Sequence, residues 1–214
     1  MVRMEDKTKP PDSNDGGKFP EEGIMNKKVF SFDLEVDGLY GVGFAIAATV
    51  RKDGREIASF EGRIPDSAVS DDWVKKNVLP ALEGMKVTHQ SSEELEEAFW
   101  EFYSQQCLIK GEYGLSFDAA GVQVIAHCGS PVESGLFRRA VERDGSRTFQ
   151  APLPLHEVGT LLEVLGEDAA SVDSYIEKHG IAVQFKGVSH HPMYDSVVAV
   201  QVWEHACARI RDKS

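Results

Sequence analysis

Apolar side chains dominate the segment from Lys28 to Leu39 (KVFSFDLEVDGL) and predict a buried β-strand there. β-branched, aromatic and aliphatic residues recur along it, and an Asp37-Gly38 turn signal follows them. The next two segments, Leu39 to Arg51 and Glu56 to Ile64, also have the composition of strands, and the Asp53-Gly54 dipeptide between them is typical of a hairpin. The chain is therefore expected to open as an antiparallel β-meander.

Helical and strand patterns alternate in the rest of the chain. Helices are expected over residues 70–80, capped by Ser70, then 93–107, 131–141, 171–179 and 192–210, with a helical turn at 161–165. Strands are expected over Val122 to Ala126 and Phe149 to Val158. The acidic run in the second of these helices predicts a solvated face (Glu93, Glu94, Glu96, Glu97). This order predicts an α/β fold, in which a mixed sheet joins the antiparallel meander to parallel strands and carries helices on its faces.

Composition limits the domain organisation and the compartment. A chain of 214 residues with 42% hydrophobic content predicts one folded domain over residues 27–214, after a polar N-terminal tail over residues 1–26 that is expected to be disordered. Three cysteines without C-x-x-C spacing favour a reduced, cytoplasmic protein. No membrane span and no signal peptide are expected, because apolar runs are short and the N-terminus is charged.

Two carboxylates interrupt the first strand. At strand periodicity Asp33 and Glu35 share one face with Ser31, about 6.6 Å apart along the backbone. Carboxylates this close repel each other at neutral pH, and a hard divalent cation with oxygen ligands relieves that repulsion. Ordinary surface acids on a half-exposed strand are the alternative interpretation. The net charge of −12 argues against a broad basic groove for duplex nucleic acid, although metal ions can supply positive charge locally.

Further ionisable residues are expected near the end of the first strand. If the first and fourth strands lie side by side, the segment after Ala126 approaches Asp33, and it brings Glu133 in the first turn of a helix. Close to the other end of the chain, His190 and His191 precede Asp195 in the first turn of the final helix.

These residues give the chain a resemblance to the DEDDh 3′-to-5′ exonucleases, the superfamily that contains proofreading subunits, ribonuclease T and oligoribonuclease. The resemblance covers residues 28–209 and implies a ribonuclease H-like fold. Its first motif is matched by Phe32, Asp33, Glu35, Gly38 and Leu39, and its third by His190 and Asp195. The second motif departs from the family, since Ala126-His127-Cys128 replaces the usual alanine-histidine-asparagine run and Glu133 replaces an aspartate one residue later than usual. The extra methylene of glutamate adds roughly 1.5 Å of reach, and Asp118 is the alternative fourth carboxylate.

The resemblance also implies a mechanism. Two Mg²⁺ or Mn²⁺ ions about 4 Å apart would be held by Asp33, Glu35, Glu133 and Asp195, and His190 would act as the general base. His191 is the rival base, or a loop residue that packs on the final helix. Leu39 and Tyr40 would pack against the terminal base, or else belong to the core of the second strand.

Several other residues have structural interpretations. His127 is expected to be a hydrogen-bonded structural histidine, Cys128 a buried thiol, and Met193 and Trp203 core residues. Phe44 and Tyr194 are weaker candidates for base stacking. Many stand-alone members of the superfamily are dimers, and Trp73, Phe99 or Trp100 could supply the interface of a homodimer or pack in the core.

The expected partner is the 3′ end of single-stranded RNA or DNA, with RNA slightly preferred. Two other functions fit the same residues. One is a weak or inactive ribonuclease H-like module that binds nucleic acid or protein, and the other is a two-metal phosphatase that acts on nucleotides.

Overall fold

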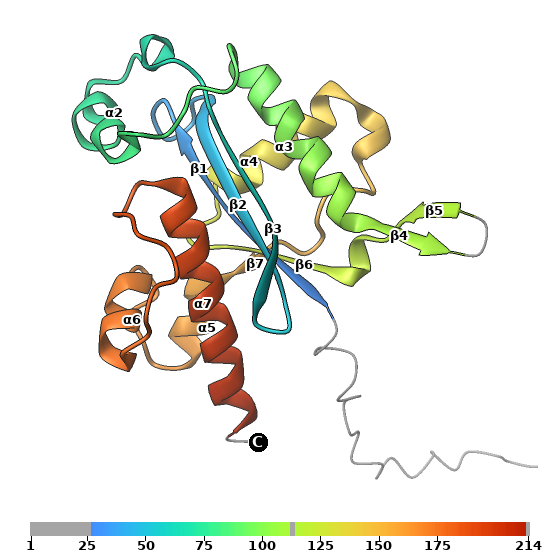
Figure 1. Cartoon of the computed structure of the whole chain (residues 1–214), viewed down its shortest axis with the longest axis vertical. Helices are drawn as coiled ribbons and strands as arrows, with labels where there is room; N and C mark the ends of the chain where they lie inside the picture. Colours follow the sequence, from blue (N-terminus) through green and yellow to red (C-terminus); the bar gives the residue numbers. More distant parts are fainter. Residues whose placement is uncertain (1–26, 112–113, 213–214) are drawn as a thin grey trace, which may run out of the picture.

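The computed structural model describes residues 27–111 and 114–212 (Figure 1). The predicted N-terminal tail, residues 1–26, lies outside this part of the chain. The five-stranded sheet has the order β3-β2-β1-β6-β7 and consists of β1 (Lys28–Val36), β2 (Gly43–Lys52), β3 (Arg55–Arg63), β6 (Val122–Ala126) and β7 (His156–Glu157). β1, β2 and β3 pair antiparallel, whereas β6 pairs parallel to both β1 and β7. The predicted mixed sheet, opened by a meander and with the first and fourth strands adjacent, is confirmed.

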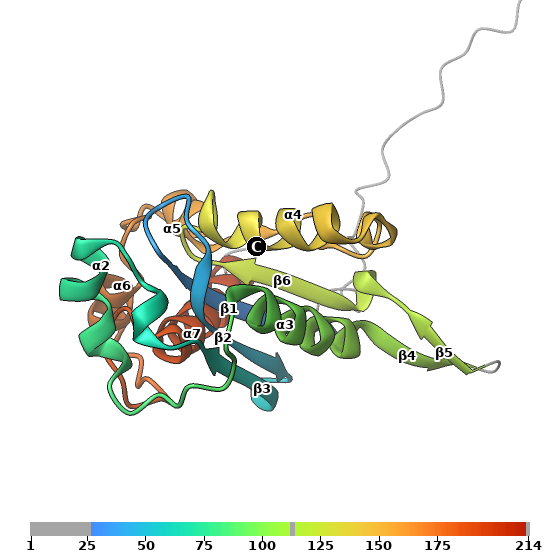
Figure 2. The same cartoon turned by 90° about the horizontal axis from the view of Figure 1, so that it is seen from above.

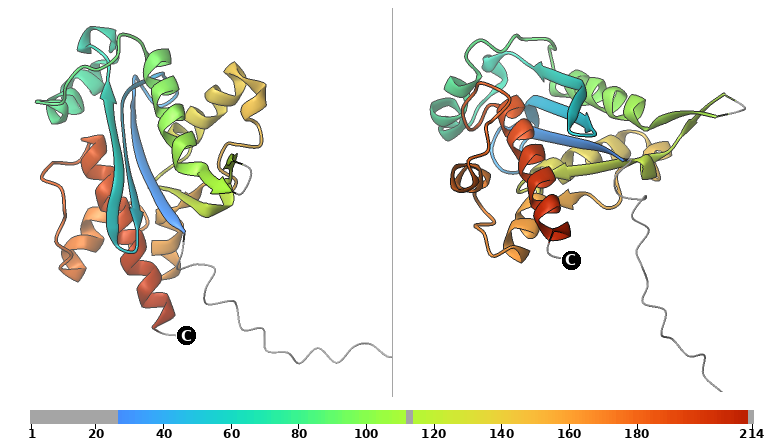
Figure 3. Two further views of the ribbon diagram at one scale, coloured as in Figure 1. Left: turned by 45° about the vertical axis from the view of Figure 1, so that its right-hand side comes forward. Right: turned by 60° about the horizontal axis from the view of Figure 1, so that its bottom comes forward.

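Helices cover both faces of this sheet. α3 (Ser92–Cys107) and α4 (Val132–Arg143) lie on one side, and α5 (Val158–Val164), α6 (Val172–His179) and α7 (Pro192–Arg211) lie on the other (Figures 1 and 3). The alternation of β1 explains the two layers. Phe30, Phe32 and Leu34 belong to the core that α3 and α4 share, whereas Val29 packs with residues of α5, α6 and α7. The polar residues Ser31, Asp33 and Glu35 therefore point to the α7 side.

Serine side chains near the predicted boundaries cap the helices α3 and α6. Ser91 and Ser171 accept hydrogen bonds from the backbone N–H groups of Glu94 and Ser174, as expected for N-caps. The short helix α2 (Asp72–Asn77) is capped by Asp71 and not by the predicted Ser70. The segments between the main elements contain 3-10 turns at η1 (Asp66–Ala68), η2 (Leu79–Leu82), η3 (Ala119–Gly121) and η4 (Gly145–Arg147). In the described ranges no helix combines the length and the apolar character needed to cross a membrane.

Two predicted strands are shorter in the structure. The second strand was expected from Leu39 but begins at Gly43, because the intervening residues form a loop. The last strand was expected from Phe149 but consists of His156–Glu157 alone. Proline has no backbone N–H to donate to a neighbouring strand, and Pro152 and Pro154 stand in that segment.

The hairpin of β4 (Leu108–Gly111) and β5 (Gly114–Phe117) was not predicted. It projects away from the main sheet (Figure 2). Its described residues are exposed apart from the half-buried Phe117, so no buried face produces the alternation of apolar and polar residues from which a strand is recognised.

The prediction of a solvated acidic face on α3 is wrong at Glu96. This side chain is only 2% exposed and accepts hydrogen bonds from Arg139 at 2.7 Å and Arg143 at 2.6 Å, both on α4. Glu97 is half-buried and binds Arg143 and Arg147. The acidic run thus joins α3 to α4 through ion pairs.

Aromatic residues proposed for other roles lie in the core. Phe99 and Trp100 are 1% and 5% exposed, and Phe99 packs against Phe30 and Phe32, so neither is available for a homodimer interface. Phe44 is 2% exposed, which excludes base stacking. Met193 and Trp203 are buried, as predicted.

Candidate functional site

Three predicted ligands meet where β1 ends and α7 begins. Asp33 and Glu35 come from β1, and Asp195 lies in the first turn of α7. One carboxylate oxygen from each lies within 4.8 Å of the other two. They meet because alternate residues of β1 face α7, and α7 starts beside this end of the strand. An oxygen-only set of this kind suits a hard divalent cation.

Glu133 lies next to this triad but outside it. It occupies the first turn of α4, where only 4% of the residue is exposed, and it lines the same cavity as the three acids. Its Oε2 atom is buried without a hydrogen-bond partner. A buried carboxylate oxygen without a partner is costly, and a cation in the cavity would supply the missing contact.

The alternative ligand, Asp118, has a structural position. Its side chain accepts a hydrogen bond from the backbone N–H of Ala120 and caps the turn η3. It does not line the cavity that holds Glu133 and the triad. Asp118 is therefore a turn residue in this structure.

Burial and neighbouring negative charges raise the pKa values of three of the carboxyl groups, Asp33, Glu133 and Asp195. Burial raises the pKa of Asp33 well above its ordinary value, and the negative charges of Glu35, Asp195 and Glu133 raise it further. Burial, with a smaller contribution from Glu35, raises the pKa of Asp195 to about 7. Burial also raises the pKa of Glu133 to about 8. Of the described residues, those that line this cavity include neither lysine nor arginine, so a bound cation would be the compensating charge.

His190 lies at the edge of the triad. Its Nδ1 atom is 3.7 Å from Glu35 Oε1, and proximity to that carboxylate raises the pKa of His190 above its ordinary value. The backbone has a left-handed φ of 68°, and 47% of the side chain is exposed. The indole ring of Trp73 on α2 meets the imidazole edge-on, with 6.0 Å between the ring centroids.

His191 faces away from the acids. It is the N-cap residue of α7, and its ring packs on Phe185 with a centroid distance of 5.4 Å. It does not line the cavity that holds the triad. Of the two histidine side chains, only that of His190 lines the cavity that holds the predicted metal ligands.

The turn between β6 and α4 differs from the prediction at Cys128, and it is held by Glu157, a residue that the sequence did not single out. Cys128 was predicted to be buried but is exposed, in a left-handed conformation with φ of 57°. Its backbone N–H and that of Gly129 donate to the two oxygens of Glu157, at 2.8 and 2.7 Å. Glu157 thereby anchors the turn that leads to Glu133. The only feature of the sequence that could have indicated this role for Glu157 is its position directly before an apolar helical turn. His127 is hydrogen-bonded as predicted for a structural histidine, since its Nε2–H donates to the carbonyl oxygen of Ala169 at 2.9 Å.

The loop after β1 presents Leu39 and Tyr40 to solvent. They are 59% and 84% exposed, so their assignment to the core of the second strand is wrong. Asp37 fixes the loop, because its carboxylate accepts hydrogen bonds from Ser70 and from the backbone N–H of Asp71. Tyr194, a candidate for base stacking, instead donates its hydroxyl to Asp173 at 3.0 Å.

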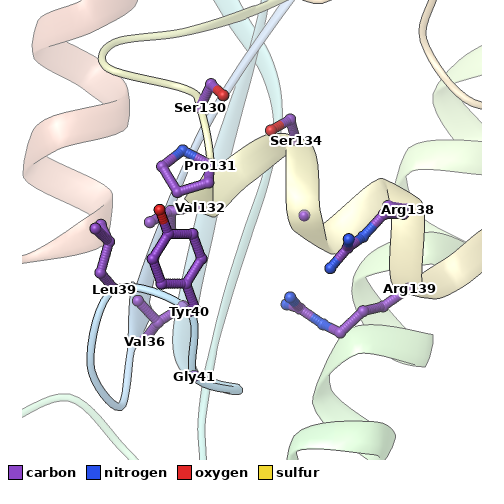
Figure 4. A pocket seen from close by; sticks show the side chains of 11 residues that line it. Val36, Leu39, Tyr40, Gly41, Ser130, Pro131, Val132, Ser134, Arg138 and Arg139 are labelled. Carbon is purple, nitrogen blue, oxygen red and sulfur yellow. The ribbon is translucent and has the colours of Figure 1, made fainter.

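Two cavities adjoin at this end of the sheet. The acidic cavity, about 480 Å³, is lined by Asp33, Glu35, Glu133, His190 and Asp195 among others. The Tyr40 cavity, about 320 Å³, is lined by residues of the Leu39–Gly41 loop and of α4 (Figure 4). Both have volumes typical of sites for small ligands.

No protein-family model matches the chain, and a search of curated proteins also finds no match.

Proposed function

We propose that this chain is a metal-dependent exonuclease that removes nucleoside monophosphates from the 3′ ends of single-stranded nucleic acid, with RNA slightly preferred over DNA. The observation that carries the proposal is the convergence of Asp33, Glu35 and Asp195, with the buried Glu133 in the same cavity and His190 at its edge. The direction of attack and the substrate class come from the resemblance of these motifs to the DEDDh exonucleases.

The residues of the cavity fit two Mg²⁺ or Mn²⁺ ions. Asp33, Glu35, Glu133 and Asp195 would hold them. The raised pKa values of Asp33, Glu133 and Asp195 and the unpartnered Oε2 of Glu133 support a site built for cations. When bound, such ions supply positive charge for the developing phosphorane and lower the pKa of a nucleophilic water.

His190 is placed to take the proton of the attacking water. Its exposed imidazole can reach a substrate in the acidic cavity, and the Glu35 carboxylate 3.7 Å from Nδ1 stabilises the imidazolium that forms. Trp73 packs against the ring and restricts its orientation. Leu39 borders the same cavity and offers an apolar wall for the terminal base.

The acidic character of the protein favours single-stranded ends over long duplex. A net charge of −12 and a cavity lined by carboxylates disfavour the binding of a long duplex backbone. Flexible single strands can place one phosphodiester at the acids without a broad basic surface.

The test is product analysis of 3′-labelled and 5′-labelled RNA and DNA oligomers, incubated with Mg²⁺, Mn²⁺ or EDTA. Stepwise release of labelled mononucleotide from the 3′ end, lost in EDTA and in an Asp33→Asn variant, is the expected result. Hydrolysis of mononucleotides in parallel assays would instead indicate a phosphatase.

The second candidate function is a weak or inactive module that binds nucleic acid or protein. One observation favours it, since Glu133 does not belong to the set of oxygens that lie within 4.8 Å of one another. Oligomer binding without cleavage under every metal condition would support this module over the exonuclease.

A further inference from the structure

A third cavity lies at the end of the sheet opposite the acids. β1 and β6 run parallel, and the cavity is lined by Lys27 and Val122, where these two strands begin. Its volume of about 410 Å³ is within the range of small-ligand sites. We call it the Phe149 cavity, after an aromatic residue that lines it. Among the described residues, none that lines this cavity also lines the acidic or the Tyr40 cavity.

One part of the Phe149 cavity is apolar and uncovered. Phe149 and Leu153 are 95% and 96% exposed, and Pro152 and Pro154 line the cavity with them. These large side chains leave apolar surface in water, and a ligand packed on them would remove that surface from water. A flat apolar group suits this wall best, because it can pack on the face of the Phe149 ring.

The backbone around Phe149 is fixed to helix α3. The guanidinium of Arg147 donates to both carboxylate oxygens of Glu97, at 2.8 and 2.6 Å. The hydroxyl of Tyr103 donates to the carbonyl oxygen of Gln150 at 2.8 Å. The residues on either side of Phe149 are therefore anchored while its ring stays in solvent. An anchored ring can contact a ligand without a large loss of backbone entropy.

The ionisable groups of the Phe149 cavity are basic. Lys27 and His156 line it, and none of the described lining residues is acidic, although the chain has a net charge of −12. Burial lowers the pKa of His156, and the charge of Lys27 lowers it further, so the two side chains lie close enough to interact. Two neighbouring basic groups in a cavity without a carboxylate are complementary to an anion.

Trp203 orients two polar side chains of the cavity. Its ring packs on His156, with 5.6 Å between the ring centroids, and its Nε1–H donates to Oε1 of Gln123 at 3.3 Å. Since Oε1 of Gln123 accepts this bond, the amide NH2 group of Gln123 can donate to a ligand. The cavity thus offers an ammonium, an imidazole and an amide NH2 group as hydrogen-bond donors.

We propose that the Phe149 cavity binds an aromatic anion, a small molecule in which a flat apolar ring carries a carboxylate, sulfonate or phosphate group. The ring would pack on Phe149 and Leu153, and Lys27, His156 and Gln123 would bind the anionic group. This site goes beyond the proposed exonuclease function and does not depend on it, because the acidic cavity is lined by different residues.

The test is a fluorescence titration with anilinonaphthalene sulfonate, an aromatic anion whose emission increases in an apolar site. Phe149→Ala and Lys27→Ala should each raise its dissociation constant about tenfold, the usual effect of losing one aromatic contact or one charged hydrogen bond. Both side chains are exposed, so the variants should keep the Tm of the wild type. Phenylnaphthylamine has the same rings without the sulfonate, and Lys27→Ala should not change its affinity.

Arg138→Ala and Leu115→Ala are the matched controls. Arg138 is an exposed cation of the Tyr40 cavity, and Leu115 is an apolar side chain on β5 that is 71% exposed. Neither lines the Phe149 cavity, so both variants should bind the probe as the wild type does. Wild-type affinity in Phe149→Ala and Lys27→Ala, or a loss found only in a control variant, would overturn the proposed site.

Competition against the same probe identifies the anionic group. Displacement by naphthalene carboxylate would indicate a carboxylate ligand, and displacement by adenosine monophosphate would indicate a nucleotide. If neutral naphthalene displaces the probe as effectively as its carboxylate does, the proposed role of Lys27 and His156 is wrong. The titrations contain neither metal nor nucleic acid, so their outcome is separate from that of the exonuclease assays.

Discussion

The backbone N–H of His190 donates a hydrogen bond of 2.8 Å to Oδ2 of Asp195, five residues later in the chain. The bond closes the turn that precedes α7 and gives His190 its left-handed conformation, with φ of 68°. It also connects the predicted base to a predicted metal ligand through the main chain. Substitution of the His190 side chain can therefore leave the position of Asp195 unchanged.

Removal of the imidazole should reduce turnover and preserve metal binding. We expect His190→Ala to lower kcat by roughly 10² to 10⁴, the range for a positioned proton acceptor. His190→Asn is a useful second variant, because asparagine tolerates the left-handed conformation better than alanine does. Single-turnover hydrolysis and Mn²⁺ titration by calorimetry would measure the two effects separately.

His191→Ala is the matched control for this prediction. Its ring packs on Phe185 and does not border the acidic cavity. A large loss of kcat in His191→Ala, with normal turnover in His190→Ala, would reverse the assignment of the base.

Asp33→Asn should abolish hydrolysis and stabilise the metal-free protein. The variant removes a buried charge that burial and three neighbouring carboxylates disfavour. We expect the Tm in EDTA to rise by roughly 2–4 °C, which corresponds to about 1 kcal/mol in a chain of this size. Added Mn²⁺ should raise the Tm of the wild type but not that of the variant. A fully active Asp33→Asn protein would contradict the two-metal proposal.

The stability of the metal-free protein should fall as the pH rises from 5 to 8.5. In the unfolded chain Asp and Glu ionise near pH 4 (about 3.9 and 4.3), whereas burial raises the pKa of Asp195 to about 7 and that of Glu133 to about 8 in the folded state. The folded protein therefore binds more protons over this interval, and its free energy of unfolding decreases as those protons are lost. Thermal unfolding in EDTA across the pH series measures the effect.

The same pH series has an internal control. Asp195→Asn should show a shallower decrease, since one of the shifted groups is gone, and saturating Mn²⁺ should reduce the decrease in the wild type. A Tm in EDTA that stays constant from pH 5 to 8.5 would mean that the carboxylates do not interact as the structure indicates.

Glu133→Gln should increase the concentration of metal needed for activity. The substitution replaces one of the four proposed ligand carboxylates, all of which line the acidic cavity, and weakens the site that Glu133 would complete. Glu133→Asp should also be impaired, because the side chain is shorter by roughly 1.5 Å on a helix whose start is one residue later than the family pattern. Initial rates against Mn²⁺ concentration for the wild type and both variants test this.

Asp118→Asn is the control for the fourth carboxylate. It keeps a side chain that can cap η3, far from the acidic cavity. The plot of initial rate against Mn²⁺ concentration for Asp118→Asn should coincide with that of the wild type. Coincident curves for the Glu133 variants as well would show that Glu133 is not a ligand.

Glu96→Gln should destabilise the protein without acting on the metal site. The buried carboxylate accepts hydrogen bonds from Arg139 and Arg143, and its neutralisation leaves both guanidiniums with a weaker partner. Loss of one partner of a buried ion pair lowers the free energy of unfolding by about 3–5 kcal/mol. Because both arginines are partly exposed, we expect a loss of about 2 kcal/mol here. Chemical denaturation measures the loss. Glu101→Gln, at an exposed position of the same helix, should have little effect.

The sequence by itself determined the order of the main elements and the identity of the acids. The strand pattern around Phe30 and Phe32 and the helical spacing of the final segment reflect burial against a core, and local periodicity records burial directly. The parallel pairing of β1 with β6 followed from the order of strands and helices. That pairing was enough to predict that Asp33 and Glu133 would lie at the same end of the sheet.

Only the tertiary structure decided how individual polar and exposed side chains are used. Glu96 and Glu101 belong to the same helix, yet α4 buries one and leaves the other in solvent. Glu157 anchors the Cys128 turn through contacts 28 and 29 residues apart, and the Tyr40 cavity forms between a loop and a helix distant in the chain. Such relationships depend on contacts between segments far apart in sequence, which local periodicity does not record.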